Sequence, residues 1–295
     1  MYYLVYGFLW LISLLPLRVL YVLSDLLTFV VYRMIGYRKE VVMNNLAIAF
    51  PEKTIEERKK IAKRFYRNFI DSFIETIKII SASERYISKR FTGNWEVANQ
   101  FYESGRRVQM HLGHNFNWEW GNLAGKAALR FQFLGVYAPI SNKVFDRIFR
   151  KIRSRSGTVL LRANNMQADI LPYRHKQYLL GLVADQNPGH MLRALWFDFF
   201  GKRAPFTAGP AKNAIANDCV VIFAFIHKPR RGRYVLELKV EEEFPQQTTT
   251  EDLTRRFVDY LEDVIRTYPD MWLWSHRRWK NEWRDDYTFV ERRKA

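Results

Sequence analysis

Two side chains in the stretch HLGHNFNWE, residues 111–119, have the types and spacing of a proton-transfer pair: His114 and Glu119. A histidine can take the proton of a hydroxyl group near neutral pH. A carboxylate can hold the imidazole in one tautomer and stabilise the imidazolium that forms. A metal site is a second interpretation, and a surface histidine followed by a glutamate that favours the positive end of a helix is the third. The spacing alone leaves all three interpretations open.

The neighbouring elements indicate where this pair lies. Residues 106–112 read as a strand, and a helix that Asn115 or Asn117 can cap follows it. His114 is therefore expected at the carboxyl end of a strand, just before a helix amino terminus, which is where open α/β sheets bind ligands. Glu119 falls in the first helical turn, from which its carboxylate can reach back toward the imidazole.

The residues offer little to a metal ion. A metal site needs a third ligand, and the spacing of His111, His114 and Glu119 does not match the HExxH pattern. Cys219 is the single cysteine, which excludes an internal disulfide and a cysteine-based zinc site. It lies in an apolar run and is expected to be a buried small hydrophobe. We therefore expect no metal and no cofactor, and we expect His111 to be structural.

The remaining pattern predicts an α/β fold, with a central, mainly parallel sheet flanked by helices. Hydrophobic residues make up 48% of the chain, enough for a sizeable core. A capping box at Thr54 and Glu57 begins a long helix over residues 55–80. Beyond residue 105, short apolar strands alternate with helices, as in parallel sheets. The further strands are expected at 131–138, 178–185, 195–200, 220–226 and 233–240, and the further helices at 142–155, 209–217 and 250–268.

The first 35 residues are strongly apolar and are interrupted by Pro16, Arg18 and Asp25. They form a kinked span, a helical hairpin in the membrane interface, or a buried helix pair. We favour membrane attachment, because the tyrosines and Trp10 suit an interface. The basic residues that follow place the rest of the chain in the cytoplasm. The expected organisation is a hydrophobic membrane anchor at 1–35 and one catalytic domain at 36–295.

The net charge of +17 predicts an anionic partner: nucleic acid, anionic lipid or an acidic protein. A nucleic-acid-binding module would leave the apolar first 35 residues unexplained, and no nucleic-acid-binding signature is present. A non-catalytic membrane scaffold would accept the anchor and the charge. It gives no reason for a histidine and a glutamate at a strand end.

Several motifs, in order, resemble the lipid A late acyltransferases, the bacterial lauroyl and myristoyl transferases that act on Kdo-lipid A. His114 and Glu119 match the HX4(D/E) signature of that family, although HNFNWE replaces the usual apolar sequence between them. The resemblance covers nearly the whole chain. Its other parts are YRKEVVMNNLAIAFP, the stretch ending in Arg153 and Arg155, LVADQNPG with Asp185 and Gln186, and YPDMWLWSHRRWK with His276, Arg277 and Arg278.

This resemblance implies transfer of a fatty acyl chain from acyl carrier protein to a hydroxyl group of a lipid A precursor, at the cytoplasmic face of the bacterial inner membrane. His114 would be the general base and Glu119 its orienting partner, and no covalent enzyme intermediate is required. An acyltransferase for another lipid acceptor is the alternative: a glycolipid, an amino-acid lipid or a lysophospholipid. Acyl chain length does not follow from the sequence.

The substrate-binding residues have two interpretations each. Arg153 and Arg155 either grip phosphates of the lipid or of phosphopantetheine by forked hydrogen bonds, or form a solvated basic face. Asp185 either orders arginine or histidine groups around the site, or belongs to an ordinary turn at a strand end. The segment containing His276 either contacts membrane or phosphate, or packs its tryptophans.

Overall fold

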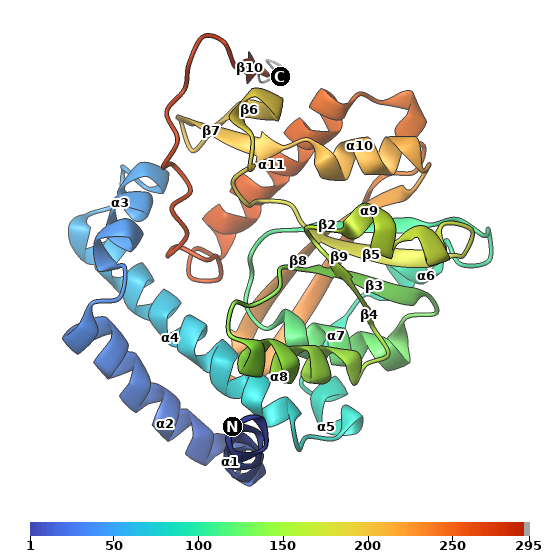
Figure 1. Cartoon of the computed structure of the whole chain (residues 1–295). Coiled ribbons are helices and arrows are strands. Elements are labelled where there is room, and N and C mark those ends of the chain that lie inside the picture. Colours follow the sequence, from blue (N-terminus) through green and yellow to red (C-terminus); the bar gives the residue numbers. More distant parts are fainter. Residues whose placement is uncertain (292–295) are drawn as a thin grey trace.

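The structure, a computed structural model, describes residues 1–291 and is built around a seven-stranded sheet (Figure 1). The strand order is β1-β9-β8-β2-β5-β3-β4. Neighbouring strands are parallel except β8 and β9, which are antiparallel. This confirms the predicted α/β class with a mainly parallel sheet. The strands are β1 (Phe91–Gly93), β2 (Val108–Leu112), β3 (Gln132–Tyr137), β4 (Val159–Arg162), β5 (Tyr178–Val183), β8 (Val220–Arg230) and β9 (Arg233–Glu242).

Helices cover both faces of this sheet, with α10 and α11 on one side and α7 and α8 on the other (Figure 1). The α-helices are α1 (Tyr2–Leu14), α2 (Leu17–Phe29), α3 (Lys39–Ala49), α4 (Ile55–Ile79), α5 (Glu84–Ser88), α6 (Glu96–Asn99), α7 (Trp118–Ala128), α8 (Lys143–Ser154), α9 (Met166–Asp169), α10 (Gly209–Ala216) and α11 (Thr250–Thr267). A π-helix covers Val30–Ile35, and 3-10 turns cover Leu171–Tyr173, Met191–Arg193 and Pro245–Gln247.

The two faces of β2 show how the sheet is buried on both sides. His111 points toward α11, where its ring meets Phe257 at 5.9 Å between centroids. Burial lowers the pKa of His111 to about 3, so it is a neutral core residue, in line with its predicted structural role. Its neighbours Met110 and Leu112 line a cavity on the side of α7. Cys219 is also fully buried, as predicted.

The strand expected at 195–200 is present at 194–199, but it belongs to a separate three-stranded sheet of order β10-β6-β7. Its members are β6 (Ala194–Phe199), β7 (Lys202–Thr207) and β10 (Thr288–Phe289). Phe200 and Gly201 both have positive φ angles, 55° and 72°, which makes the tight hairpin between β6 and β7. This hairpin was not predicted, because Phe200 is not a residue that favours positive φ. The short edge strands β1 and β4 were also missed.

The long helix α4 begins as predicted. The Thr54 side chain accepts a hydrogen bond from the Glu57 amide, and the Glu57 carboxylate accepts one from the Thr54 amide at 2.7 Å. This reciprocal capping box satisfies amide groups that the first turn would otherwise leave unpaired. The helix packs against α1 and α2 on one side and α7 on the other, and so connects the amino-terminal helices to the segment that contains His114 and Glu119 (Figure 1).

The chain bends by 116° between α1 and the segment Leu17–Ile35, which joins α2 to the π-helix, and the break lies at Pro16 in extended backbone. The Lys78 ammonium of α4 donates to the carbonyls of Ser13 and Leu15, which fixes this corner. Within residues 1–291, no one helix has the length and apolar composition needed to cross a membrane. The bent pair α1–α2 with its π-helical extension meets that test only when its parts are counted together.

Candidate active site

His114 and Asp185 lie side by side because they follow neighbouring parallel strands, β2 and β5. The Ala184 amide donates to the Leu112 carbonyl at 2.9 Å, so the two chains stay paired just beyond the strands. His114 Nδ1 lies 2.5 Å from Asp185 Oδ1, and the His114 amide donates to Oδ2 at 2.9 Å. The same Oδ2 accepts the indole N–H of Trp272 at 2.7 Å. Asp185 therefore holds both the ring and the main chain of His114.

The electrostatics of this pair suit proton transfer. Burial disfavours the imidazolium, but the charge and hydrogen bond of Asp185 outweigh it and raise the pKa of His114 above its ordinary value. Burial works against the carboxylate as well, yet the contacts with His114 and Trp272 hold the pKa of Asp185 below its usual range. Because Asp185 accepts the Nδ1 proton, the unprotonated nitrogen of the neutral ring is Nε2. Within residues 1–291, Nε2 makes no hydrogen bond, and 32% of the His114 side chain is exposed.

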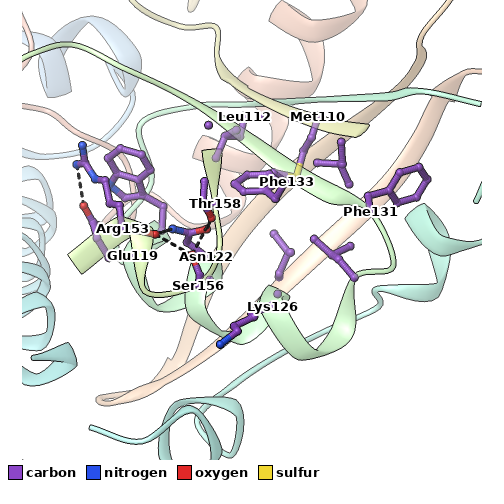
Figure 2. A pocket seen from close by; sticks show the side chains of 18 of the residues that line it. Met110, Leu112, Glu119, Asn122, Lys126, Phe131, Phe133, Arg153, Ser156 and Thr158 are labelled. Carbon is purple, nitrogen blue, oxygen red and sulfur yellow. Dashed lines mark hydrogen bonds and ion pairs between the residues drawn. The ribbon is translucent and has the colours of Figure 1, made fainter. Parts of the chain in front are cut away.

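The Glu119 carboxylate does not contact His114 within the described residues; it forms a salt bridge with Arg153 of α8 at 3.0 Å (Figure 2). Both side chains are nearly buried, with Glu119 5% and Arg153 12% exposed. The expectation that Glu119 reaches back to the imidazole therefore differs from the geometry. The reason is the strand order, which puts Asp185 on the ring nitrogen that Glu119 was expected to meet.

The amino terminus of α7 also differs from the expectation in one detail. Asn117 occupies the cap position, but its side chain makes no capping hydrogen bond and its backbone is left-handed, with φ of 66°. The capping position is therefore as predicted, but the side chain of Asn117 does not cap the helix. The side-chain amide of Asn117 instead donates a hydrogen bond to the Glu75 carboxylate of α4 at 2.7 Å. Sequence reasoning missed Glu75, because a glutamate in a basic amphipathic helix gives no signal of burial.

The two candidate arginines have different surroundings. The Arg153 guanidinium lies over the Trp118 ring, 4.4 Å from its centroid, and its buried Nε has no hydrogen-bond partner among residues 1–291. The Arg155 guanidinium donates to main-chain carbonyls at the end of α4, those of Ile79, Ile80 and Ala82. Arg153 thus belongs to the interior of the site and Arg155 closes a helix end. Arg153 is therefore not on a solvated face, whereas Arg155 is exposed to solvent, and phosphate binding by either stays a prediction.

An apolar cavity of about 370 Å³ lies between the sheet and helices α7 and α8 (Figure 2). Leu112 and Glu119, which flank His114 in the sequence, are both in its wall. Arg153 supplies charge at the same end, next to Glu119. The rest of the lining is mainly aromatic and aliphatic, including Phe91, Trp95, Met110, Phe131, Phe133 and Leu179. A cavity of this composition suits a hydrocarbon chain.

The carboxyl-terminal tryptophan segment forms the other side of the site. Asn115 is bridged to Trp272, and the His276 ring lies 6.3 Å from the His114 ring between centroids. Burial lowers the pKa of His276 to about 4, so this second imidazole is neutral at ordinary pH. Arg278 is fully buried and donates to the Asn187 side chain at 2.7 Å and the Pro205 carbonyl at 2.8 Å. The tryptophans and Arg278 of this segment are therefore packed in the interior, as one of its two interpretations expects.

Within residues 1–291, no group of three or more histidine, cysteine or acidic side chains is arranged to hold a metal ion.

Comparison with known proteins adds the family. Residues 1–281 match the model of the bacterial lipid A biosynthesis acyltransferases. The chain is 25% identical to a lipid A biosynthesis lauroyltransferase of Escherichia coli K12, over 93% of this chain and 89% of that one. It is 22% identical to a lipid A biosynthesis palmitoleoyltransferase of the same organism and to a lipid A biosynthesis acyltransferase of Shigella flexneri, with the same coverage. The chain belongs to the bacterial lipid A biosynthesis acyltransferase family and is an O-acyltransferase.

Proposed function

We propose that this enzyme transfers a fatty acyl chain from acyl carrier protein to a hydroxyl group of a lipid A precursor, with His114 as the general base. The observation that carries this proposal is the His114–Asp185 pair, whose Nε2 is unprotonated and unpaired within the described residues, beside an apolar cavity. An alcohol is a poor nucleophile at neutral pH, so a base positioned in this way supplies what the reaction needs.

The steps balance without a covalent enzyme intermediate. His114 Nε2 takes the hydroxyl proton as the oxygen attacks the carbonyl carbon of the thioester. The tetrahedral intermediate carries its negative charge on the former carbonyl oxygen. As it collapses, the carbon–sulfur bond breaks, and the imidazolium returns the proton to the departing thiolate. The products are an ester and a free thiol. Asp185 holds the imidazole in the reactive tautomer and stabilises the imidazolium.

Glu119 and Arg153 have a separate role in this proposal. Their salt bridge fixes the guanidinium in the cavity wall, where the unpaired Arg153 Nε–H is a donor in a nearly water-free setting. A fixed donor of this kind stabilises charge that develops on a carbonyl oxygen. We assign this task to Arg153 and the positioning of Arg153 to Glu119. The acyl tail would occupy the apolar cavity beyond them.

In this proposal the positive net charge attracts the acyl donor, and the apolar amino terminus binds the membrane. Acyl carrier protein is strongly acidic, and this chain carries a net charge of +17. Helices α1 and α2 leave large apolar side chains exposed, and a basic cluster of Arg33, Arg38 and Lys39 follows them. We propose that this bent pair attaches the enzyme to the cytoplasmic face of the inner membrane. The exposed apolar side chains include Leu4, Phe8, Leu11, Val22, Leu26 and Phe29.

Mass spectrometry of lipid A and total lipids, from cells with the gene, without it, and with the His114→Ala variant, tests this function. We expect one acyl chain to be missing from lipid A in the last two strains. A change confined to a phospholipid, glycolipid or amino-acid lipid would assign the alternative acceptor. Fractionation of the full-length protein tests the attachment. Recovery in the soluble fraction at moderate salt without detergent would contradict membrane binding.

A further inference from the structure

We infer that Glu75 is a positioning residue for the catalytic loop: through the side chain of Asn117 it sets the geometry of the segment that carries His114. This inference rests on the proposed role of His114 as the base. Glu75 lies on α4, it is fully buried, and it touches neither the base nor the cavity. Its effect on the reaction is therefore transmitted through the loop between β2 and α7.

The contacts of Glu75 join three separate parts of the molecule to this loop. Its Oε2 accepts hydrogen bonds from the Asn117 amide at 2.7 Å and from the Tyr234 hydroxyl of β9 at 2.6 Å. Its Oε1 accepts one from the Tyr21 hydroxyl of α2 at 2.5 Å. Its main-chain carbonyl accepts the indole N–H of Trp120, in the first turn of α7, at 2.8 Å. One residue thus holds both the loop and the start of the helix that follows.

Asn117 needs such a restraint. It is fully buried, and its backbone is left-handed, a conformation that is uncommon outside glycine, although asparagine adopts it more readily than most residues. Within the described residues, its Oδ1 has no hydrogen-bond partner, so the bond to Glu75 is the one that holds this side chain. Asn117 stands three residues after His114 and two before Glu119. A change in its backbone would displace both ends of the motif.

The cost of burying this carboxylate indicates a purpose other than stability. Burial raises the pKa of Glu75 to about 7, although Lys228 opposes that rise. Three donors converge on the carboxylate and favour its ionised form, against the burial that raises its pKa. Buried ionised groups contribute little net stability compared with apolar packing, but they do fix one arrangement of the groups around them. The arrangement fixed here is the turn that begins α7.

A double-mutant cycle between the two residues tests the inference, with transfer rates measured on the full-length enzyme. Asn117→Gly keeps the left-handed backbone accessible and removes the amide. Glu75→Gln keeps the shape of the side chain and replaces one acceptor oxygen by an amide nitrogen. We expect each change to lower kcat by about 10- to 100-fold with little change in KM, as small displacements of catalytic groups do. The double variant should be no slower than the slower single variant, because both remove the same restraint.

Tyr234→Phe is the matched control. It removes a hydrogen bond of similar length to the same Glu75 oxygen and keeps the ring, which packs on Trp120; within residues 1–291 the Tyr234 hydroxyl makes no hydrogen bond with the loop. We expect the midpoint of thermal unfolding to fall by a similar amount in all three single variants, while Tyr234→Phe keeps kcat within about twofold, as expected away from a functional contact. A merely structural role for Glu75 would instead make the loss of kcat follow the loss of stability.

Three results would overturn the inference: an Asn117→Gly enzyme with kcat near that of the wild type, additive losses in the double variant, or a Tyr234→Phe enzyme as slow as Asn117→Gly. The His114→Ala variant separates this inference from the proposed function. If that variant is active, the base assignment fails. If it is inactive while Asn117→Gly is fully active, the positioning role alone fails.

Discussion

Two charged pairs stand at the two ends of the HX4E motif, and they differ in what they can do. His114 pairs with the wholly buried Asp185, yet 32% of its own side chain reaches solvent. Glu119 pairs with Arg153, and both are nearly buried. The first pair contains a group that can gain and lose a proton near neutral pH, and one edge of its ring is accessible. The second contains a fixed cation inside the cavity wall.

The two residues of the motif therefore do not pair with each other; its spacing marks two separate positions. Each motif residue takes its partner from another element: Asp185 comes from the end of β5 and Arg153 from α8. The motif spans only one tight loop and the first turn of α7. Within that span the two side chains face different neighbours. If the comparison is right, changes at the two ends of the motif have distinct kinetic signatures.

The largest expected effect comes from removing the proposed base. His114→Ala should lower the rate of acyl transfer by about 10³- to 10⁴-fold, the upper part of the range for a positioned general base. The variant should still fold, because the ring is partly exposed and Asp185 keeps its hydrogen bonds from the main-chain amide at position 114 and from Trp272. Rates with purified acyl donor and lipid acceptor measure the loss. An active His114→Ala enzyme would end the mechanism, and stoichiometric zinc that disappears with this substitution would favour a metal site.

Asp185→Asn should come next, with a fall in kcat of about 10²- to 10³-fold and a shifted pH profile. The base works in its neutral form, so activity is lost as pH falls through the pKa of His114. Asp185 raises that pKa, which puts the acid limb of the wild-type profile above the ordinary histidine value of about 6.5. Without the carboxylate charge, burial dominates, and the limb should move to lower pH. The profile of kcat/KM at constant ionic strength measures it; an unmoved limb would separate Asp185 from the titrating group.

The sequence predicted where His114 and Asp185 lie in the fold, but it did not predict which residues contact each other. The apolar runs of β2 and β5, each followed by a polar residue, indicate that His114 and Asp185 stand at carboxyl ends of strands. Which carboxylate meets the imidazole depends on the strand order β8-β2-β5, and no local pattern contains that information. Trp272 completes the site from 158 positions beyond His114 in the chain, and its contact with Asp185 follows from tertiary packing alone.

Other features were missed for related physical reasons. The hairpin of β6 and β7 depends on positive φ at Phe200, which its residue type opposes. The role of Glu75 depends on burial against β9 and α2, whereas the periodicity of α4 indicates only an amphipathic helix. The apolar amino terminus is compatible with a core pair, a span and an interfacial hairpin, and its tyrosines and Trp10 favour membrane attachment without fixing its form. The capping box of α4 was predictable because all its determinants lie within four residues.

Glu119→Gln should have a smaller effect than Asp185→Asn and a different form. It leaves the Arg153 guanidinium buried without its counter-charge, so the donor in the cavity wall is no longer fixed, and kcat should fall by about 10- to 100-fold. The acid limb of the pH profile should stay where it is in the wild type, because Glu119 does not touch the imidazole. Arg153→Met combined with Glu119→Gln is the control and should be no slower than Arg153→Met alone. An acid limb displaced by Glu119→Gln as far as by Asp185→Asn would show that both carboxylates act on the base.

The smallest effect is expected on the outer face of α8, the helix that provides Arg153. Arg153 is engaged in the interior, whereas Arg150, three residues earlier, is exposed to solvent. Exposed cations attract an acidic carrier protein over distances comparable with the Debye length, which shrinks from about 10 Å at 0.1 M salt to about 3 Å at 1 M. Arg150→Glu should therefore raise the KM for the acylated carrier protein about two- to tenfold at low salt, with kcat unchanged. The difference from the wild type should vanish at high salt.

Lys176→Glu, an exposed site before β5 with the same change in charge, is the control and should have no effect of this size. Because phosphates of the acceptor draw on the same net charge, donor and acceptor are varied separately. A donor KM that ignores salt, or an acyl-CoA donor used as well as the carrier protein, would show that neither α8 nor the net charge selects the donor.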